Sequence, residues 1–177
     1  MNLPYPAPAT PTTTAAAATA DPLTPAVPTP PGTVDCSIAA TRLADFFSTL
    51  TEHSVQDLAR YYAADARFKD PFNDVQGVAA IAPIFAHMFE ALEQPHFVVT
   101  GQLVQGLQCF MTWEFRFRFK NFKRGEQQRI LGASHLVFSP AELVTLHRDY
   151  WDAAEELYAK LPLVGALMRW LKRRANS

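Results

Sequence analysis

The sequence predicts an α+β fold in which helices come first in the chain and a long antiparallel sheet follows them. Apolar residues recur at helical spacing early in the folded region, where Leu43, Phe46, Phe47 and Leu50 share one side of a helix. Over residues 96–151 the pattern instead alternates between apolar and polar residues, as expected of strands. The alternation gathers apolar residues on one face, so one side of the sheet must pack against the helices.

Residues 1–34 differ from the rest of the chain. The stretch PTTTAAAATADPLTPAVPTPPGT is rich in Pro, Thr and Ala and is almost uncharged. Such a composition buries too little apolar surface to offset its conformational entropy, which predicts a disordered arm. The arm has neither the basic start nor the continuous apolar run of a signal peptide. We therefore place the folded domain at residues 35–152 and expect a cytoplasmic protein.

The composition argues against several classes of function. Sixteen basic residues face seventeen acidic ones, and the formal net charge of −1 does not favour a nucleic-acid-binding surface. The two cysteines, Cys36 and Cys109, match no disulfide framework or metal-binding spacing. The five histidines are scattered, without a pair at the spacing of helical metal ligands. We expect neither a metal nor a nucleic-acid partner.

Four elements are expected before the long strands. Helical spacing predicts a helix over residues 43–50 and a short second helix over residues 55–62. The segment ARFKD, residues 66–70, has the length of a strand. Gly77 then opens another helix, whose pattern contains Pro83. Because a proline inside a helix removes one hydrogen bond, this helix is expected to kink or to begin later than its pattern suggests.

Four strands are expected after Pro95. They are the runs HFVVTGQLV, LQCFMTWEFRFRFKNF, EQQRILGASHLVF and LVTLHRDYW. The second run alternates most clearly, with an apolar face made by Leu107, Cys109, Met111, Trp113, Phe115, Phe117 and Phe119. Its other face carries charged side chains, which predicts a surface that faces solvent or a second subunit.

Residues 153–177 form a basic amphipathic segment, with apolar side chains on one side and arginine and lysine side chains on the other. We expect a helical tail. The alternatives for it are weak contact with a membrane surface, docking on a partner, or packing back over the domain or a second subunit.

The stretch YYAADARFKDPFNDVQG, residues 61–77, is similar to a segment of ketosteroid isomerases. There, too, an aromatic residue precedes a short strand, an Asp-Pro pair and a glycine-led helix. With the order of the elements, this motif makes residues 37–151 resemble SnoaL-like and ketosteroid-isomerase-like proteins of the nuclear transport factor 2 superfamily. The resemblance implies a cone-shaped fold, in which a strongly curved antiparallel sheet packs on three N-terminal helices around an apolar pocket. It also implies a homodimer formed through the outer sheet face.

The resemblance assigns roles to individual residues. The general base of the isomerases falls on Asp70. Their two donors to the developing enolate oxygen fall on Phe46, which has no hydroxyl, and on Ser134, which is a weaker donor. Losing one such donor commonly costs about 3 kcal/mol of transition-state stabilisation, so efficient steroid isomerisation is not expected.

Two questions stay open at the level of sequence. Asp70 precedes Pro71, so it is either a base or a turn residue whose carboxylate accepts local backbone hydrogen bonds. Asp149 is a second candidate, because SnoaL-type cyclases, which the chain resembles, work with a single acid/base aspartate. The alternative for Asp149 is a structural role, in which it or Asp152 caps the following helix.

The last strand has two faces, His147, Asp149 and Trp151 on one and Leu146, Arg148 and Tyr150 on the other. The weak alignment favours the second set inside, and a bulge at the strand end would reverse this choice.

The sequence thus predicts a SnoaL-like protein that binds a hydrophobic small molecule, such as a polyketide, a steroid-like compound or a lipid-derived carbonyl compound. The reaction would be an isomerisation or cyclisation with Asp70 as the acid/base, without a cofactor, because enolate chemistry needs only a base and a donor. The residues expected around the substrate are Phe46, Tyr62, Phe68, Trp113, Ser134, Arg148 and Tyr150. The alternative is a non-catalytic ligand-binding or accessory module, which the missing oxyanion donors favour.

Overall fold

The computed structural model describes residues 35–120, 125–156 and 174. The predicted disordered arm lies outside these ranges, as does most of the predicted tail. The helical elements are α1 (Ser37–Ser48), the 3₁₀ helix η1 (His53–Arg60), α2 (Val78–Ala91) and α3 (Ala153–Glu156). The strands are β1 (Tyr62–Lys69), β2 (Asp74–Gln76), β3 (Leu92–Gln105), β4 (Gln108–Phe119), β5 (Gln128–Phe138) and β6 (Val144–Tyr150).

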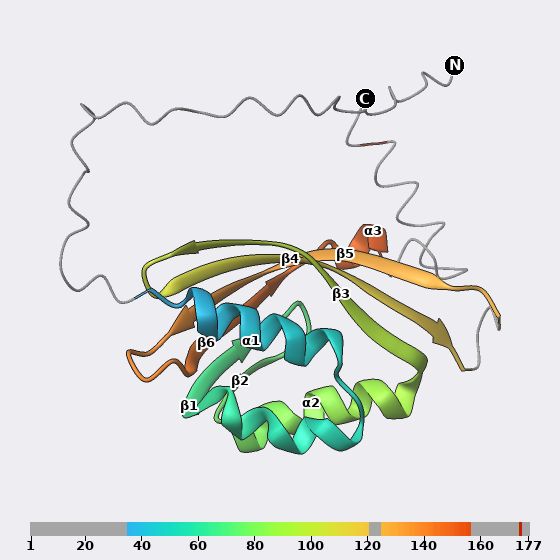
Figure 1. Cartoon of the computed structure of the whole chain (residues 1–177). Helices are drawn as coiled ribbons and strands as arrows, with labels where there is room; N and C mark the ends of the chain where they lie inside the picture. Colours follow the sequence, from blue (N-terminus) through green and yellow to red (C-terminus); the bar gives the residue numbers. More distant parts are fainter. Residues whose placement is uncertain (1–34, 121–124, 157–173, 175–177) are drawn as a thin grey trace, which may run out of the picture. The chain divides into compact units, whose positions relative to one another are not determined.

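The described strands form one six-stranded sheet in the order β2-β1-β6-β5-β4-β3. The sheet arches over α1, η1 and α2, which lie on its concave side (Figure 1). Strands β3 to β6 form the predicted antiparallel run. The sheet as a whole is mixed, because β1 pairs with β6 in parallel. Parallel neighbours cannot be joined by a hairpin, and here the chain between β1 and β6 includes α2 and the four other strands of the sheet.

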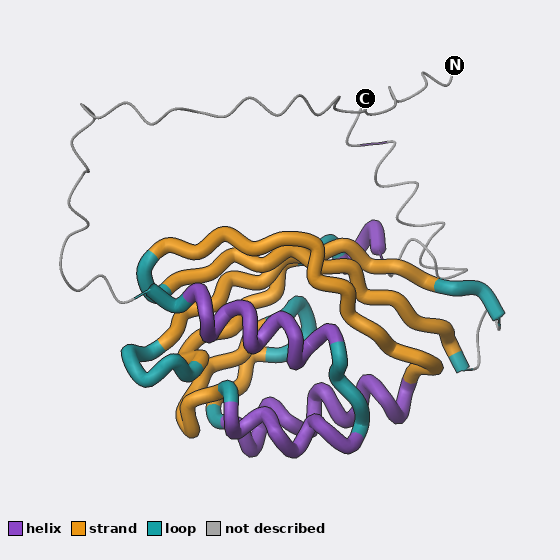
Figure 2. The backbone as a smooth tube through the Cα atoms, in the orientation of Figure 1, coloured by secondary structure: helices purple, strands orange, loops and turns teal. Residues whose placement is uncertain are grey.

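The curvature of the sheet has a local cause in β3. The pairing of β3 with β4 shifts register between Glu93 and His96 and again between Val99 and Gly101. Such bulges bend a strand and increase its twist. The sheet and the helices form two layers (Figure 2). Buried apolar side chains of both layers pack together between them.

The helix predicted after Gly77 is present. It begins at Val78, so of the two alternatives for it the later start was wrong, and Pro83 lies inside it on an exposed position. Gly77 has φ +93°, a conformation that side chains disfavour, and its amide donates to the carbonyl of Ala66. The glycine therefore turns the chain directly from β2 into α2.

The core follows the predicted alternation in β4. Cys109, Met111, Trp113, Phe115 and Phe117 are all buried, and the residues between them are more exposed. The buried residues fall into two clusters. One fills the space between α1, α2 and the sheet, and a smaller one lies under β4 and β5. The candidate site takes residues from both.

Candidate functional site

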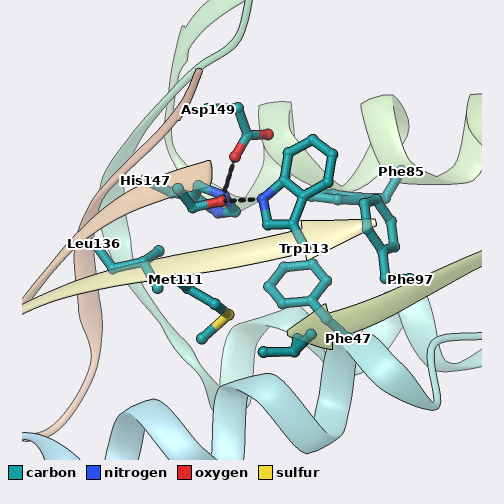
Figure 3. A pocket seen from close by; sticks show the side chains of 10 residues that line it. Phe47, Phe85, Phe97, Met111, Trp113, Leu136, His147 and Asp149 are labelled. Atoms are coloured by element: carbon teal, nitrogen blue, oxygen red, sulfur yellow. Dashed lines mark hydrogen bonds and ion pairs between the residues drawn. The ribbon is translucent and has the colours of Figure 1, made fainter. Parts of the chain in front are cut away.

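A narrow cavity lies between the helices and the concave sheet face (Figure 3). Its lining residues are Phe47, Phe85, Phe97, Val99, Met111, Trp113, Ser134, Leu136, His147 and Asp149. The cavity has a volume of about 20 Å³, which is room for one or two water molecules. Most of the lining is apolar, and the polar groups gather at one end.

Strand register brings the polar residues together. Ser134 on β5 lies directly opposite both Met111 on β4 and Asp149 on β6. His147 precedes Asp149 by two residues, so both side chains leave β6 on the same face. In Figure 3 the polar ends of His147, Asp149 and Trp113 point toward one another.

The polar groups form a hydrogen-bond chain that ends on Asp149. The indole of Trp113 can only donate, and its Nε1–H donates to Ser134 Oγ at 2.9 Å. The Ser134 hydroxyl then donates to Asp149 Oδ1 at 2.5 Å. His147 Nε2 lies 2.8 Å from the same oxygen and 3.2 Å from Ser134 Oγ. The Ser134 hydroxyl and His147 Nε2 thus meet on one oxygen of the Asp149 carboxylate, and these contacts fix its orientation.

The second oxygen of Asp149 is left for other partners. No described residue donates to Oδ2, and no unsatisfied buried polar atom occurs among the described residues. Oδ2 is therefore accessible, either from the cavity or from an outer groove that Asp149 also lines. The Asp149 side chain is 16% exposed, so it is a carboxylate between an apolar interior and solvent.

His147 is enclosed by aromatic residues. Its side chain is 4% exposed, and its ring meets the rings of Phe47 and Phe68 edge-on. Its Nδ1 lies 2.5 Å from the hydroxyl of Tyr62. Burial, and secondly the charge of Asp149, raise the pKa of Tyr62 well above its ordinary value. The phenol therefore stays protonated and can donate to Nδ1.

Asp70 lies elsewhere. It is not among the described residues that line the cavity, and it borders the outer groove. Its Oδ1 accepts hydrogen bonds from the backbone amides of Phe72 and Asn73, at 2.7 and 2.6 Å, and from the Asn73 side chain. This geometry favours the turn interpretation of Asp70 over the catalytic one.

The turn role makes a testable prediction. Replacing Asp70 with alanine leaves two backbone amides without their acceptor, which is expected to lower the free energy of unfolding by about 1–2 kcal/mol. Chemical denaturation measures this change. Asp70→Asn keeps an acceptor oxygen and serves as the control, with a smaller loss. Equal stability of Asp70→Ala and the wild type would contradict the turn role.

The other residues predicted around the substrate divide into three groups. Trp113 and Ser134 line the cavity. Tyr62 and Phe68 lie behind it in the core and contact His147. Phe46 is also buried, but it stacks on Tyr61, and its neighbour Phe47 lines the cavity instead.

The preferred face of the last strand was the wrong one. Arg148 and Tyr150 are exposed on the outer sheet face, where the guanidinium lies 4.9 Å from the centre of the Tyr150 ring. His147 and Asp149, the other set, point inward. The weak alignment misplaced this strand by one residue, and a shift of one residue exchanges the two faces.

Several lining residues were not predicted as a site. For Phe85, Phe97 and Leu136 the sequence offers only apolar periodicity. This pattern predicts that a residue is buried, but not whether it lines a cavity or packs in the core. Met111 and Phe47 belong to stripes that were expected to be buried. Among the described residues no group of histidine, cysteine or acidic side chains has a geometry suited to a metal ion. No described helix combines the length and hydrophobicity needed to cross a bilayer.

The comparisons with known proteins agree with this architecture. The family model of the SnoaL-like domain matches residues 43–147. A protein with a ketosteroid isomerase-like fold from Catenulispora acidiphila, solved in complex with trimethylamine, is 19% identical with a TM-score of 0.58, over 70% of this chain and 93% of its own. TsrD from Streptomyces laurentii is 14% identical with a TM-score of 0.58, over 69% and 93%.

An LEH-like epoxide hydrolase from M. tuberculosis is 11% identical with a TM-score of 0.55, over 68% of this chain and 85% of its own. At these identities the likeness concerns the fold alone. A search of curated proteins finds no sequence that matches this chain.

Proposed function

The chain belongs to the SnoaL-like domain family, and we propose that it is a cofactor-independent isomerase or cyclase in which Asp149 transfers a proton of a small, apolar carbonyl compound. One observation carries the proposal. Asp149 is a carboxylate at the polar end of an otherwise apolar cavity, with Oδ1 held by two donors and Oδ2 left accessible. This is the arrangement that a positioned acid/base requires.

In this proposal Asp149 carries out both proton transfers. Asp149 Oδ2 removes the proton next to the carbonyl carbon, and the electron pair of the C–H bond moves into an enolate. The carboxylic acid so formed returns the proton to a different carbon, or to the enolate oxygen, and Asp149 is ionised again. The contacts of Ser134 and His147 with Oδ1 hold the carboxylate in one orientation through the cycle.

The size of the cavity restricts the substrate. A space that holds one or two water molecules admits a carbonyl compound only if lining side chains move. Phe47, Phe85 and Phe97 come from α1, α2 and β3 and form the apolar wall opposite the polar cluster (Figure 3). A small or flat apolar ligand demands the least movement of these rings.

The same small volume favours a second candidate function. A cavity nearly filled by its own side chains suits a non-catalytic accessory module as well. The two functions differ in one measurable property, which is whether a bound carbonyl compound exchanges its α-hydrogen.

The test uses compounds that the purified full-length protein retains, identified by mass spectrometry. The protein is incubated with each compound in D₂O, and the mass of the compound is followed. An enzyme of the proposed type incorporates deuterium at the carbon next to the carbonyl faster than buffer does. If no retained compound gains deuterium or changes structure, the protein is a carrier and the proposal fails.

We also propose that the chain forms a homodimer through the outer sheet face. Leu103, Phe110, Leu131 and Tyr150 are large apolar or aromatic residues on this face, and each is at least 46% exposed. Leu103 and Phe110 are direct neighbours across β3 and β4. Apolar side chains grouped in this way favour a protein–protein contact.

Sedimentation analysis tests the dimer. Exchanging Leu131 for glutamate buries a charge in the contact and is expected to weaken dimerisation by about tenfold or more. Ile38→Glu is the matched control, because Ile38 is 72% exposed on α1, away from this face. A wild-type protein that stays monomeric at high concentration would refute the proposal.

A further inference from the structure

We propose that Tyr62 is a positioning residue of this site: its hydroxyl holds the His147 ring so that Nε2–H stays directed at Asp149. The inference rests on the proposed function for its consequence in catalysis. The geometry that carries it lies in the hydrogen bonds on the two ring nitrogens of His147.

Tyr62 reaches His147 from a different part of the sheet. It is the first residue of β1, and it lies opposite Val144 at the start of β6. The parallel pairing shifts register after Tyr62 and resumes at Arg67, so that Phe68 is the residue opposite His147. The Tyr62 ring runs nearly parallel to the His147 ring, with 24° between the planes and 6.0 Å between the centres. The Tyr62 hydroxyl thereby lies within hydrogen-bond distance of Nδ1.

The directions of the hydrogen bonds follow from chemistry. A protonated phenol can donate its O–H, and Nδ1 of His147 accepts it when the proton of the neutral imidazole lies on Nε2. Nε2 lies 2.8 Å from a carboxylate oxygen of Asp149, which can only accept while it is ionised. Each ring nitrogen thus has a partner of the complementary kind, and the two bonds select the same tautomer.

Without the Tyr62 hydroxyl, Nδ1 of the His147 ring loses its hydrogen-bond partner. Nδ1 lies in aromatic surroundings, and no described residue other than Tyr62 is within hydrogen-bond distance of it. The ring would then be held only at Nε2, and rotation about its Cβ–Cγ bond would carry Nε2–H away from Asp149. Ser134 would still donate to Asp149, so the carboxylate would keep one of its two donors.

The test measures the His147 side chain by NMR in the ligand-free, full-length protein labelled with ¹⁵N. The wild type is expected to show the Nε2–H tautomer, with a slowly exchanging Nε2 proton. In Tyr62→Phe this proton is expected to exchange about tenfold faster or more. The buried Nδ1 then has no hydrogen-bond partner, and this loss of free energy makes the His147 ring leave its position at Asp149 more often by about that factor.

Tyr61→Phe is the matched control. Tyr61 precedes Tyr62, stacks on Phe46, and donates its hydroxyl to no described residue. Its substitution is expected to leave the exchange of the His147 proton within about twofold of the wild type. The hydrogen exchange of backbone amides in β5 reports global stability. If the role of Tyr62 were purely structural, its substitution would speed up the exchange of these amides and of the His147 proton alike.

Two results would overturn the inference. One is a His147 proton that exchanges equally fast in Tyr62→Phe and the wild type. The other is the Nδ1–H tautomer in the wild type itself, a measurement that does not depend on whether the variant folds. Neither result requires a substrate, so the inference can fail while deuterium exchange by Asp149 succeeds, and the reverse.

Discussion

The Asp149→Asn variant is expected to lose deuterium exchange of the bound compound by about 10²- to 10⁴-fold, the usual contribution of a positioned acid/base. Asparagine has nearly the size of aspartate and can still accept a hydrogen bond from Ser134, so the cavity should keep its shape. Its amide cannot take up a proton at neutral pH. Binding of the retained compound is therefore expected to stay close to that of the wild type while exchange disappears.

Asp70→Asn separates this result from the other candidate base. Asp70 is held by the amides of Phe72 and Asn73 and borders the outer groove, so its carboxylate is not expected to touch the compound. Exchange in Asp70→Asn should remain within about threefold of the wild type. The reverse outcome, with exchange lost in Asp70→Asn and kept in Asp149→Asn, would return the acid/base role to Asp70.

Much of the fold was predictable because it depends on local periodicity. The alternation from Cys109 to Phe117 identified both β4 and its buried face. The stripe around Phe46 and Phe47 identified α1. The family resemblance added the curvature and the place of the helices, which periodicity alone does not contain.

The candidate site depends on contacts between distant segments, and here the sequence left two answers open. His147 is buried because Tyr62 and Phe68, on a strand paired in parallel, surround it. Arg148 faces outward, where it stacks on Tyr150. A strand of alternating residues is compatible with either face, so only the pairing of β6 with β1 and β5 decides between them.

Gly132 was not among the predicted site residues, although it supports the polar cluster. It lies directly opposite Trp113 across β4 and β5. A Cβ atom at position 132 would come within 2.3 Å of the indole ring, so the ring lies flat over the glycine. Packing against Gly132 places the Trp113 indole so that its Nε1–H donates to Ser134, and Ser134 in turn donates to Asp149.

Gly132→Ala is therefore expected to lower the free energy of unfolding by about 2–4 kcal/mol. An overpacked contact costs about 1–3 kcal/mol, and the displaced indole also loses its hydrogen bond to Ser134, worth about 1 kcal/mol. Chemical denaturation followed by tryptophan fluorescence measures both the stability and the altered surroundings of Trp113.

Gly101→Ala is the matched control, because it adds the same methyl group to another strand of the sheet. Its added Cβ would meet only the Thr112 hydroxyl, at 3.1 Å, and a hydroxyl on a rotatable side chain can move aside. Its cost should stay below about 1 kcal/mol. If the two variants were equally stable, the indole would not depend on Gly132 for its place. Trp113 would then be an ordinary core residue, and the orientation of Asp149 would rest on the hydroxyl of Ser134 and the imidazole of His147 alone.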